Sequence, residues 1–401
     1  MNILIISEYV QTGGIATYLL QLCPALQKRG DRVHLVTLDC DESIEAKLNN
    51  LKISYYKISV PYRNFLQNAV SKAWHVLLYA WTELKNTPYD YVLLNTPLAS
   101  PGVIFASRLL QKRPQIVYQF HGAIDLEEQY NDNLLDAYLR RKPNRLCRLK
   151  KTLKYLLKKY IQILVLRRVK TVVAFSNYAG NLVMRHFSIP QNKIMIVRPG
   201  VSPDKAKHRV DFALSYKLLP NVPILVTVTR IEPRKGIFIY LEALQYVRRM
   251  GRQFLAVIYA DFANSTATDL TQLVIAEIHR RLLQNNVVLV QHVNDNIKFA
   301  LLKKADLFVL PSLDLETFGL VSLEAFSCGV PVCAFNIGAN PEVLVDQKQL
   351  LVPTLNAHEL AKTINNFLLF PVGEINRIKR RIRTNLKHYK WSDYIQAVFP
   401  E

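Results

Sequence analysis

The sequence predicts an α/β protein with two doubly wound, Rossmann-like domains that face a cleft. The chain has 401 residues, which is too long for one ordinary hydrophobic core and suits two. Short β-branched runs alternate with amphipathic helical stretches, a pattern typical of parallel strands joined by crossover helices. This alternation occurs twice along the chain, so each half is expected to form its own sheet.

The first series of strands begins at the N-terminus. A Gly13-Gly14 loop follows the first strand, and a helix then runs to about Arg29 and ends at Gly30. Because Glu8 interrupts the first apolar run and no basic residue precedes it, we interpret this run as a buried strand and not as a signal peptide. The predicted strands are Ile3–Ile6, Val33–Thr37, Tyr91–Leu94, Ile116–Phe120 and Val172–Phe175.

The second series begins after Pro199-Gly200 and a polar stretch. Its predicted strands are Ile224–Thr229, Leu255–Tyr259, Val287–Val290, Leu307–Leu310 and Val332–Ala334. We therefore expect a first domain over residues 1–200, a second over 201–380, and a C-terminal helix over 381–401 that returns to the first domain. In open parallel sheets, ligands bind at the carboxyl ends of the strands, so the loops there are the candidate sites.

Cysteine content and hydropathy limit the class of protein. The five cysteines form no Cys-x-x-Cys pair, which fits a reducing cytosol and speaks against a disulfide framework or a structural zinc site. No run of about eighteen apolar residues is present, so a membrane-spanning helix is not expected. The sequence therefore predicts a cytoplasmic protein.

Positive charge is concentrated in one part of the chain. The net charge is +21, and residues 137–203 contain sixteen Lys and Arg but no Asp or Glu. Within residues 140–170, lysines alternate with apolar residues at helical spacing, as in helices that lie on anionic membranes. A domain helix packed on the sheet is the alternative, and both descriptions can hold together. We find no nucleic-acid recognition motif and expect no nucleic-acid partner. The apolar positions are Leu149, Leu153, Leu156, Leu157, Tyr160, Ile161 and Leu164.

The segment from Leu310 to Val332 carries the first candidate site. Glu316 lies in the loop before a helix that starts near Gly319, and Glu324 lies within that helix, about 12 Å further along. This spacing suits two parts of one extended ligand, although Glu316 could also cap the helix and Glu324 could be solvated. The unpaired N–H groups at the helix start would bind a diphosphate. They belong to Phe318, Gly319, Leu320 and Val321.

Other strand ends carry residues that suit phosphate or sugar. Arg230 and Lys235 follow one strand, and two cations at that spacing suit a diphosphate, although a solvated basic turn has the same composition. Gly14 permits close approach of the backbone to a ligand, and His121 could bond a sugar hydroxyl or be structural. Asp39-Cys-Asp41 and Asp314-Leu-Glu316 come near the Asp-x-Asp pattern of a metal–diphosphate site, but we expect no metal.

These elements occur together and in order, and the chain resembles the family 4 retaining glycosyltransferases of the GT-B fold. The resemblance covers nearly the whole sequence, and its most specific element is the Glu-x7-Glu pair. It rests on Gly13-Gly14, Tyr89-Asp-Tyr-Val, Phe120-His121-Gly122, Phe175-Ser-Asn-Tyr, Arg198-Pro-Gly-Val, Arg230…Lys235-Gly236, Glu316…Glu324, Gly338-Ala-Asn-Pro-Glu-Val and Trp391-Ser-Asp-Tyr.

The resemblance implies roles for individual residues. Arg230 and Lys235 would bind the donor diphosphate, Glu324 the ribose, and Glu316 the donor sugar, with Glu316 counted as catalytic. His121 would line the donor-sugar pocket as a second catalytic residue, and Gly14 would lie near the phosphate. His292 and Val293 would lie beside the base, although His292 occupies a position that is often Gly. Two further departures from the pattern are Thr229 and Ala339.

The resemblance also implies a function. We expect transfer of a sugar from a UDP- or GDP-sugar to a glycan or lipid-linked acceptor, with retention of configuration and without a metal cofactor. The protein would work in the cytoplasm, bound peripherally to the inner face of the membrane through residues 140–170. The alternatives are a non-catalytic nucleotide-sugar or polyanion binder on the same fold, a sugar-nucleotide epimerase, and a phosphorylase carrying a pyridoxal cofactor.

Overall fold

The computed structural model describes the chain except for residues 12, 59–64, 202–221, 262–264 and 291–294. The chain divides into two compact α/β units, each built on its own sheet. The first unit contains residues 1–129, 142–200 and 390–401, and the second contains residues 130–141 and 201–389.

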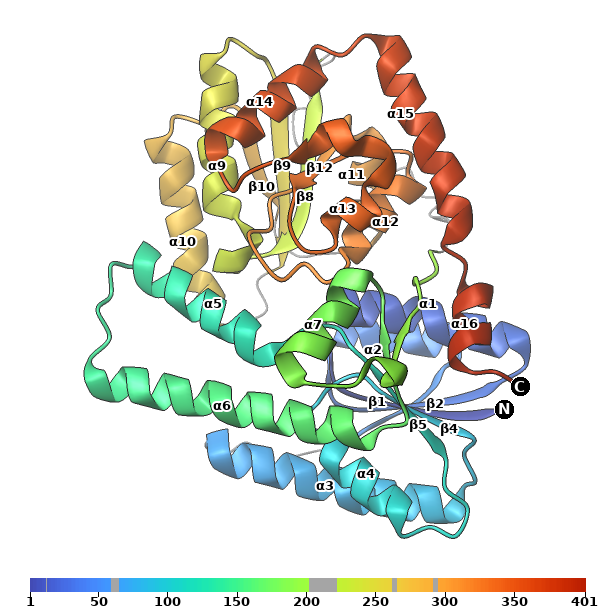
Figure 1. Cartoon of the computed structure of the whole chain (residues 1–401). Helices are drawn as coiled ribbons and strands as arrows, with labels where there is room; N and C mark the ends of the chain where they lie inside the picture. The colour runs from blue at the N-terminus through green and yellow to red at the C-terminus, as the bar shows by residue number, and fades with distance from the viewer. Residues whose placement is uncertain (12, 59–64, 202–221, 262–264, 291–294) are drawn as a thin grey trace. The chain divides into compact units, whose positions relative to one another are not determined.

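The first unit is a seven-stranded parallel sheet with the strand order β3-β2-β1-β4-β5-β6-β7 (Figure 1). Its strands are β1 (Asn2–Val10), β2 (Arg32–Cys40), β3 (Ser54–Lys57), β4 (Tyr91–Leu94), β5 (Gln115–Gln119), β6 (Thr171–Ala174) and β7 (Ile194–Ile196). Its helices are α1 (Gly14–Arg29), α2 (Glu42–Asn50), α3 (Phe65–Asn86), α4 (Ser100–Arg108), α5 (Ile124–Tyr138, whose last turns belong to the second unit), α6 (Arg145–Arg168), α7 (Asn177–Phe187), η1 (Gln191–Lys193) and α16 (Trp391–Val398).

Helices cover both faces of this sheet, as an all-parallel sheet requires. Alternate strand residues such as Leu4 and Val92 pack against α3, α4, α6 and α7. Helix α1 buries a separate apolar stripe, and α16 packs beside it. The hydroxyl of Tyr394 donates to Gln119 Oε1 at 2.7 Å and lies 2.7 Å from the Tyr18 hydroxyl, so α16 is bonded into the first unit.

The second unit is a six-stranded parallel sheet with the order β10-β9-β8-β11-β12-β13. Its strands are β8 (Ile224–Arg230), β9 (Leu255–Asp261), β10 (Val287–Val290), β11 (Leu307–Leu310), β12 (Val332–Phe335) and β13 (Leu351–Val352). Its other elements are η2 (Pro233–Lys235), α9 (Ile237–Arg249), α10 (Ser265–Arg280), α11 (Asp295–Lys304), α12 (Leu320–Ser327), α13 (Asn340–Val343), η3 (Val345–Leu350), α14 (Ala357–Leu368), α15 (Val372–Asn385) and η4 (Leu386–His388).

Both sheets share one topology, and the predicted fold class is confirmed. In each, the first strand of the series lies centrally, its successors extend to one side, and the fourth strand returns to its other side. The point where the order reverses lies between β1 and β4 in one sheet and between β8 and β11 in the other. Ligands of such sheets bind at the carboxyl ends of these two strands.

The division into units differs from the predicted domain boundaries in two segments. Residues 130–141 lie with the second unit because Tyr130 and Leu134 pack against its core and the Tyr138 ring contacts Phe238. Residues 381–389 also lie there, since α15 buries Ile378 and Ile382. The C-terminal segment that belongs to the first unit therefore begins at Lys390.

Candidate active site

In the second unit, the loop after β8 contacts the loop after β11. Gly236 ends η2 with φ 71°, and a Cβ at this position would lie 1.9 Å from the carbonyl oxygen of Pro311. The Leu313 N–H donates to the Arg234 carbonyl oxygen at 2.8 Å, which ties the two loops together. Only glycine permits this approach, so Gly236 brings the cationic loop against the acidic one.

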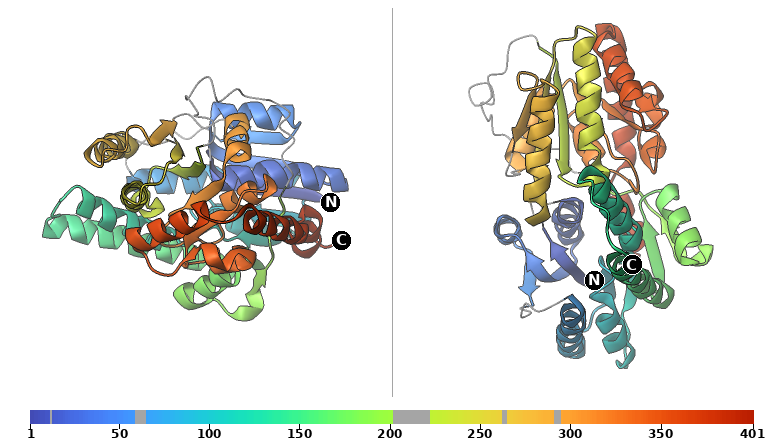
Figure 2. Two further views of the ribbon diagram at one scale, coloured as in Figure 1. Left: turned by 90° about the horizontal axis from the view of Figure 1, so that it is seen from above. Right: turned by 90° about the vertical axis from the view of Figure 1, so that its left-hand side faces the viewer.

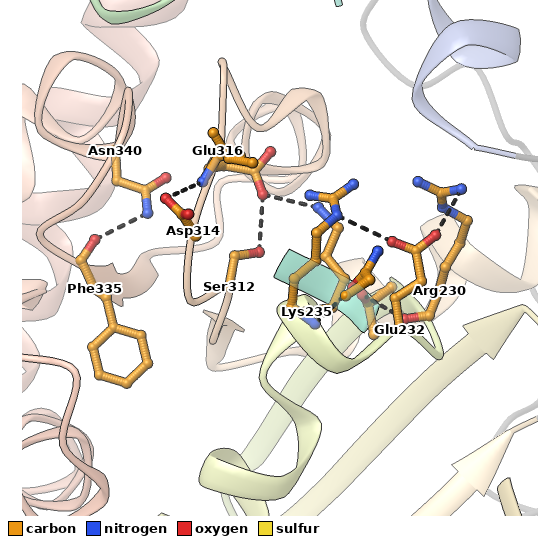
Figure 3. Close-up of polar contacts among 12 residues, drawn as sticks. Arg230, Glu232, Lys235, Ser312, Asp314, Glu316, Phe335 and Asn340 are labelled. Atoms are coloured by element: carbon orange, nitrogen blue, oxygen red, sulfur yellow. Dashed lines mark hydrogen bonds and ion pairs between the residues drawn. The ribbon is translucent and has the colours of Figure 1, made fainter. Parts of the chain in front are cut away.

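Lys235 and Glu316 form an ion pair at this junction (Figure 3). The Lys235 Nζ lies 3.0 Å from Glu316 Oε2, and the Ser312 hydroxyl donates to the same oxygen at 2.9 Å. Both charged side chains are largely buried. Helix α12 begins with Gly319 as its N-cap and has no side-chain cap, so Glu316 serves the ion pair instead of capping the helix.

The loop that carries Glu316 is held in a costly conformation. Leu315 has φ 52°, in the left-handed region that residues with a Cβ rarely adopt. Its N–H donates to Asp314 Oδ1 at 2.8 Å, and the Ala339 N–H donates to the Glu316 carbonyl oxygen at 2.8 Å. A Cβ on Gly338 would lie 2.5 Å from that same carbonyl oxygen. Strain of this kind persists where neighbouring contacts enforce it, and it is common at functional sites.

Three cations and two carboxylates gather in this cluster. Arg230, at the end of β8, is half exposed and lies 2.8 Å from Glu232 Oε1. The Arg234 side chain is buried, and its Nε lies 3.2 Å from Glu232 Oε2. The backbone N–H of Arg234 donates to Asn131 Oδ1 at 3.1 Å. Glu232 and Arg234 were not predicted from the sequence, and the bond to Asn131 comes from a residue 103 positions away.

Burial and neighbouring charges shift the pKa values of both members of the ion pair. Burial lowers the pKa of Lys235 and is the largest effect; Glu316 and Glu232 oppose it, and Arg234 and Arg230 add to it. Burial would raise the pKa of Glu316, but Lys235 and Arg234 outweigh it, so that pKa falls below its usual range. With three cations and two carboxylates, the cluster keeps one formal positive charge that an anion would neutralise.

Glu324 lies on α12 and is buried, contrary to the alternative of a solvated helix residue. The Lys298 Nζ, from α11, lies 2.6 Å from Glu324 Oε1 and 3.1 Å from Asp295 Oδ1. Burial would lower the pKa of Lys298, but the two carboxylates raise it above its usual range. Lys298 was not among the predicted site residues, because the position of a lysine within a helix does not indicate which carboxylate it contacts.

The remaining predicted donor-binding positions of the second unit are at the start of α12. Phe318 and Gly319 precede the helix, and Leu320 and Val321 form its first turn. Gly319 has φ 76°, which lets the chain turn into the helix directly after the strained loop. His292 and Val293 lie outside the described residues.

In the first unit, the carboxyl ends of β4 and β5 bring Asn95 and His121 together. The His121 Nε2 lies 3.1 Å from Asn95 Oδ1, so the neutral ring donates from Nε2 because an amide oxygen only accepts. Burial lowers the pKa of His121 to about 3, so the ring is neutral at physiological pH. Gly14 is the first residue of α1, after the β1 strand end. The predicted positions of this unit thus lie at carboxyl ends of its strands.

The candidate metal pairs are occupied by other contacts. Asp39 Oδ2 accepts from the Gln11 side chain at 2.9 Å, and Asp314 accepts from the Leu315 N–H. Among the described residues, no group of three or more His, Cys, Asp or Glu side chains could hold a metal ion.

Solved structures with this architecture are glycosyltransferases of the GT-B class. A glycosyltransferase from Rickettsia africae superposes with a TM-score of 0.73 at 19% identity, over 100% of this chain and 99% of that one. Anabaena Alr3699/HepE in complex with UDP-glucose superposes with a TM-score of 0.75 at 20% identity, over 99% and 98% of the two chains. At this identity the likeness establishes the fold.

Two family models match the sequence. The model described as Glycosyltransferase Family 4 matches residues 12–205, and the model described as Glycosyl transferases group 1 matches residues 215–385. The chain belongs to the family 4 glycosyltransferases.

Curated relatives match part of their length. D-inositol 3-phosphate glycosyltransferase of Segniliparus rotundus is 31% identical over 42% of this chain and 37% of the relative. A GDP-mannose-dependent phosphatidylinositol monomannoside mannosyltransferase of Mycolicibacterium smegmatis is 33% identical over 32% and 34%. A putative colanic acid biosynthesis glycosyltransferase, WcaL of Escherichia coli, is 25% identical over 53% and 50%. The chain thus spans about half or less of these curated relatives' lengths.

Proposed function

We propose that this chain transfers a sugar from a UDP- or GDP-sugar to a glycan or lipid-linked acceptor, with retention of the anomeric configuration. The matched relatives support this assignment, since their names include GDP-mannose-dependent enzymes acting on phosphatidylinositol mannosides and a colanic acid enzyme. A matched solved structure holds UDP-glucose.

The observation that carries the proposal is the Lys235–Glu316 ion pair at the carboxyl ends of β8 and β11. In this proposal the donor diphosphate binds Arg230 and Lys235, whose positive charge stabilises the leaving nucleoside diphosphate. Glu316 then exchanges part of its contact with Lys235 for the donor-sugar hydroxyls. Glu324, oriented by Lys298, accepts hydrogen bonds from the ribose.

The proposal includes metal independence and retention. The cations of the cluster and the N-terminus of α12 supply the charge that a divalent ion supplies elsewhere. Retention would follow from attack by the acceptor hydroxyl on the face that the leaving group vacates, and we assign no protein nucleophile. In this proposal the Nε2–H of the neutral His121 ring exchanges Asn95 Oδ1 for a sugar oxygen.

The location is part of the same proposal. None of the five cysteines, all of them among the described residues, forms a disulfide, which fits a reducing compartment. Nucleotide sugars are polar anions, so a cytoplasmic protein bound peripherally at the membrane would have access both to them and to a lipid-linked acceptor.

Slow hydrolysis of candidate donors tests the proposal without knowledge of the acceptor. UDP-, GDP- and ADP-sugars are incubated with the wild-type chain, with Lys235→Ala and Glu316→Gln, and with Lys348→Ala, an exposed lysine of the second unit, as a matched control. One donor should be hydrolysed by wild type and control, with at least a tenfold loss in both site variants, and EDTA should not change the rate.

The anomer released early in the reaction is read by NMR before it mutarotates. The same anomer as in the donor supports retention, and the opposite anomer contradicts it. Binding of a donor without hydrolysis, and without transfer to any glycan or lipid extract, would instead support the non-catalytic alternative.

A further inference from the structure

Helix α6 exposes a row of large apolar side chains. Between 59% and 66% of the surface of each is exposed, although side chains of this kind normally lie inside. They follow one another at spacings of three and four, so they form one stripe along the helix. The members of this leucine stripe are Leu146, Leu149, Leu153, Leu156 and Tyr160.

The leucine stripe points away from the core of its own unit. The buried residues of α6 are Gln162, Val165 and Leu166, all in its last two turns. At about 100° per residue, they lie on the side of the helix opposite the stripe. The Gln162 side chain donates to the Gly122 carbonyl oxygen at 2.9 Å, which fixes the rotation of the helix. The first turns of α6 project beyond the sheet of this unit (Figures 1 and 2).

The structure divides the apolar positions of the sequence analysis into two groups. Leu157, Ile161 and Leu164 are half buried, whereas the others predicted are exposed. The protein therefore uses one part of the helix surface for its own packing. A second apolar surface remains, and Leu146 extends it by a further turn.

Basic residues flank the leucine stripe on both sides. Lys150 lies along one edge, and Arg145 and Lys159 lie along the other. No acidic residue occurs between residues 137 and 203, so nothing on the helix itself neutralises them. Lys154 and Lys158 lie on the helix surface farther from the stripe and form ion pairs with Glu128. These pairs connect α6 to α5.

We propose that the leucine stripe of α6 inserts into the surface of an anionic membrane. The leucines enter the boundary between headgroups and acyl chains, and the flanking Lys and Arg bind lipid phosphates. Among the described residues, no helix is both long and apolar enough to cross a bilayer. The inference concerns a surface of the first unit and does not depend on the proposed donor site.

A second copy of this chain is the competing occupant, because spacings of three and four also occur in coiled coils. In such a pair the positions beside the seam would be Arg145, Lys150 and Lys159. Facing helices would then place positive charges against one another with no acidic partner. An anionic lipid surface complements these charges, whereas a second copy repels them.

Co-sedimentation of the full chain with vesicles tests the inference. Vesicles of equal parts phosphatidylglycerol and phosphatidylcholine are compared with phosphatidylcholine alone at about 0.1 M salt, where charges beyond about 10 Å are screened. Wild type should bind the anionic vesicles. Leu149→Ser with Leu153→Ser should weaken binding about a hundredfold, at about tenfold per buried leucine. Lys150→Glu with Lys159→Glu should also weaken it.

Matched controls distinguish binding through the leucine stripe from non-specific adsorption of apolar side chains and from an effect of net charge. Leu369→Ser removes an exposed leucine of the second unit, and Lys348→Glu with Lys387→Glu makes the same charge change there. Both should bind as wild type does, and since the changed side chains are exposed, apart from the partly buried Lys159, far-UV circular dichroism should be unchanged. Equal binding by the stripe variants and wild type overturns the inference. So does a stable dimer in light scattering that the leucine substitutions dissociate.

Discussion

Replacing Lys298 with Met should destabilise the second unit, because it leaves the Glu324 charge buried. Both side chains of this pair are 6% exposed, and the Nζ–Oε1 distance is 2.6 Å. Removing one partner of such a pair typically costs about 3–5 kcal/mol. Met preserves most of the volume of the lysine side chain, so the loss should come from the charge and not from a cavity.

The loss of unfolding free energy has an upper limit, because the Glu324 carboxylate left without Lys298 can take up a proton. A glutamate titrates at about 4.3 in an unfolded chain, and each pH unit above that value corresponds to about 1.4 kcal/mol. At pH 7 protonation therefore costs about 3.7 kcal/mol, and the loss should be no larger than about 4 kcal/mol. At pH 5 the same calculation gives about 1 kcal/mol.

The sign of the pH dependence follows from proton counts. In Lys298→Met the folded state binds a proton on Glu324 that the unfolded state releases above about pH 4.3. The unfolded state then holds fewer protons, so the free energy of unfolding falls as the pH rises. Relative to wild type, the variant should be nearly normal at pH 5 and strongly destabilised at pH 7.

Urea unfolding at both pH values measures the effect. Trp74, Trp81 and Trp391 all belong to the first unit, so tryptophan fluorescence reports on that unit, and far-UV circular dichroism reports on both. The dichroism transition should shift to lower urea at pH 7.

Two control variants sharpen the result. Glu324→Gln should lose less than Lys298→Met, because Lys298 keeps Asp295 at 3.1 Å. The double variant with Met at both positions should recover most of the stability, since an apolar pair carries no buried charge. An equal loss in the two single variants, or a loss in Lys298→Met that does not shrink at pH 5, would refute this reasoning.

Three further predictions concern other positions. Gly236→Ala should lower the free energy of unfolding by more than about 2 kcal/mol in urea unfolding, because its Cβ would lie 1.9 Å from a carbonyl oxygen. The control Gly251→Ala, with φ 77° and no atom within 4 Å, should lose only about 1–2 kcal/mol. Tyr394→Phe should cost about 1–2 kcal/mol in fluorescence-monitored unfolding, because it removes a buried hydroxyl with two partners, and no loss would contradict a role in binding α16. His121, with a pKa of about 3 when folded, should stay neutral by NMR down to about pH 4. The free energy of unfolding should fall as the pH drops below 6.5, by at most about 1.4 kcal/mol per pH unit, because the unfolded chain takes up a proton there. This slope should flatten in His121→Phe.

The central strands could be predicted from the sequence, and three outer strands could not. Each predicted strand corresponds to a strand of the structure, because buried parallel strands are continuous β-branched runs. The missed strands β3, β7 and β13 each form an edge of their sheet, and two to four residues make up each one. β3 is mostly exposed and carries no apolar run, whereas β7 and β13 have only three and two residues, too few for a period to mark them as strands.

Lys235 and Glu316 lie in loops at the carboxyl ends of parallel strands, as the sequence predicted. Because two loops at a point of strand reversal must lie close together, Lys235 and Glu316 could be assigned to one ligand before their contact was known. Their other partners could not be assigned, since Ser312, Arg234 and Asn131 reach the cluster through side-chain directions that sequence spacing does not specify. The roles of all these residues in binding a donor stay predictions.

The electrostatics of the cluster connect its geometry to the proposed ligand. Lys235 and Glu316 are paired, and a pair isolated from other charges would raise the pKa of the base while lowering that of the acid. Here both pKa values are lowered: for Lys235, burial is the largest effect and outweighs the attraction that the ammonium gains from Glu316 and Glu232. The cluster contains three cations and two carboxylates, so one formal positive charge is left without a partner of opposite sign. A diphosphate bound beside Lys235 would add negative charge and stabilise the ammonium form, so donor binding and protonation of Lys235 should favour each other.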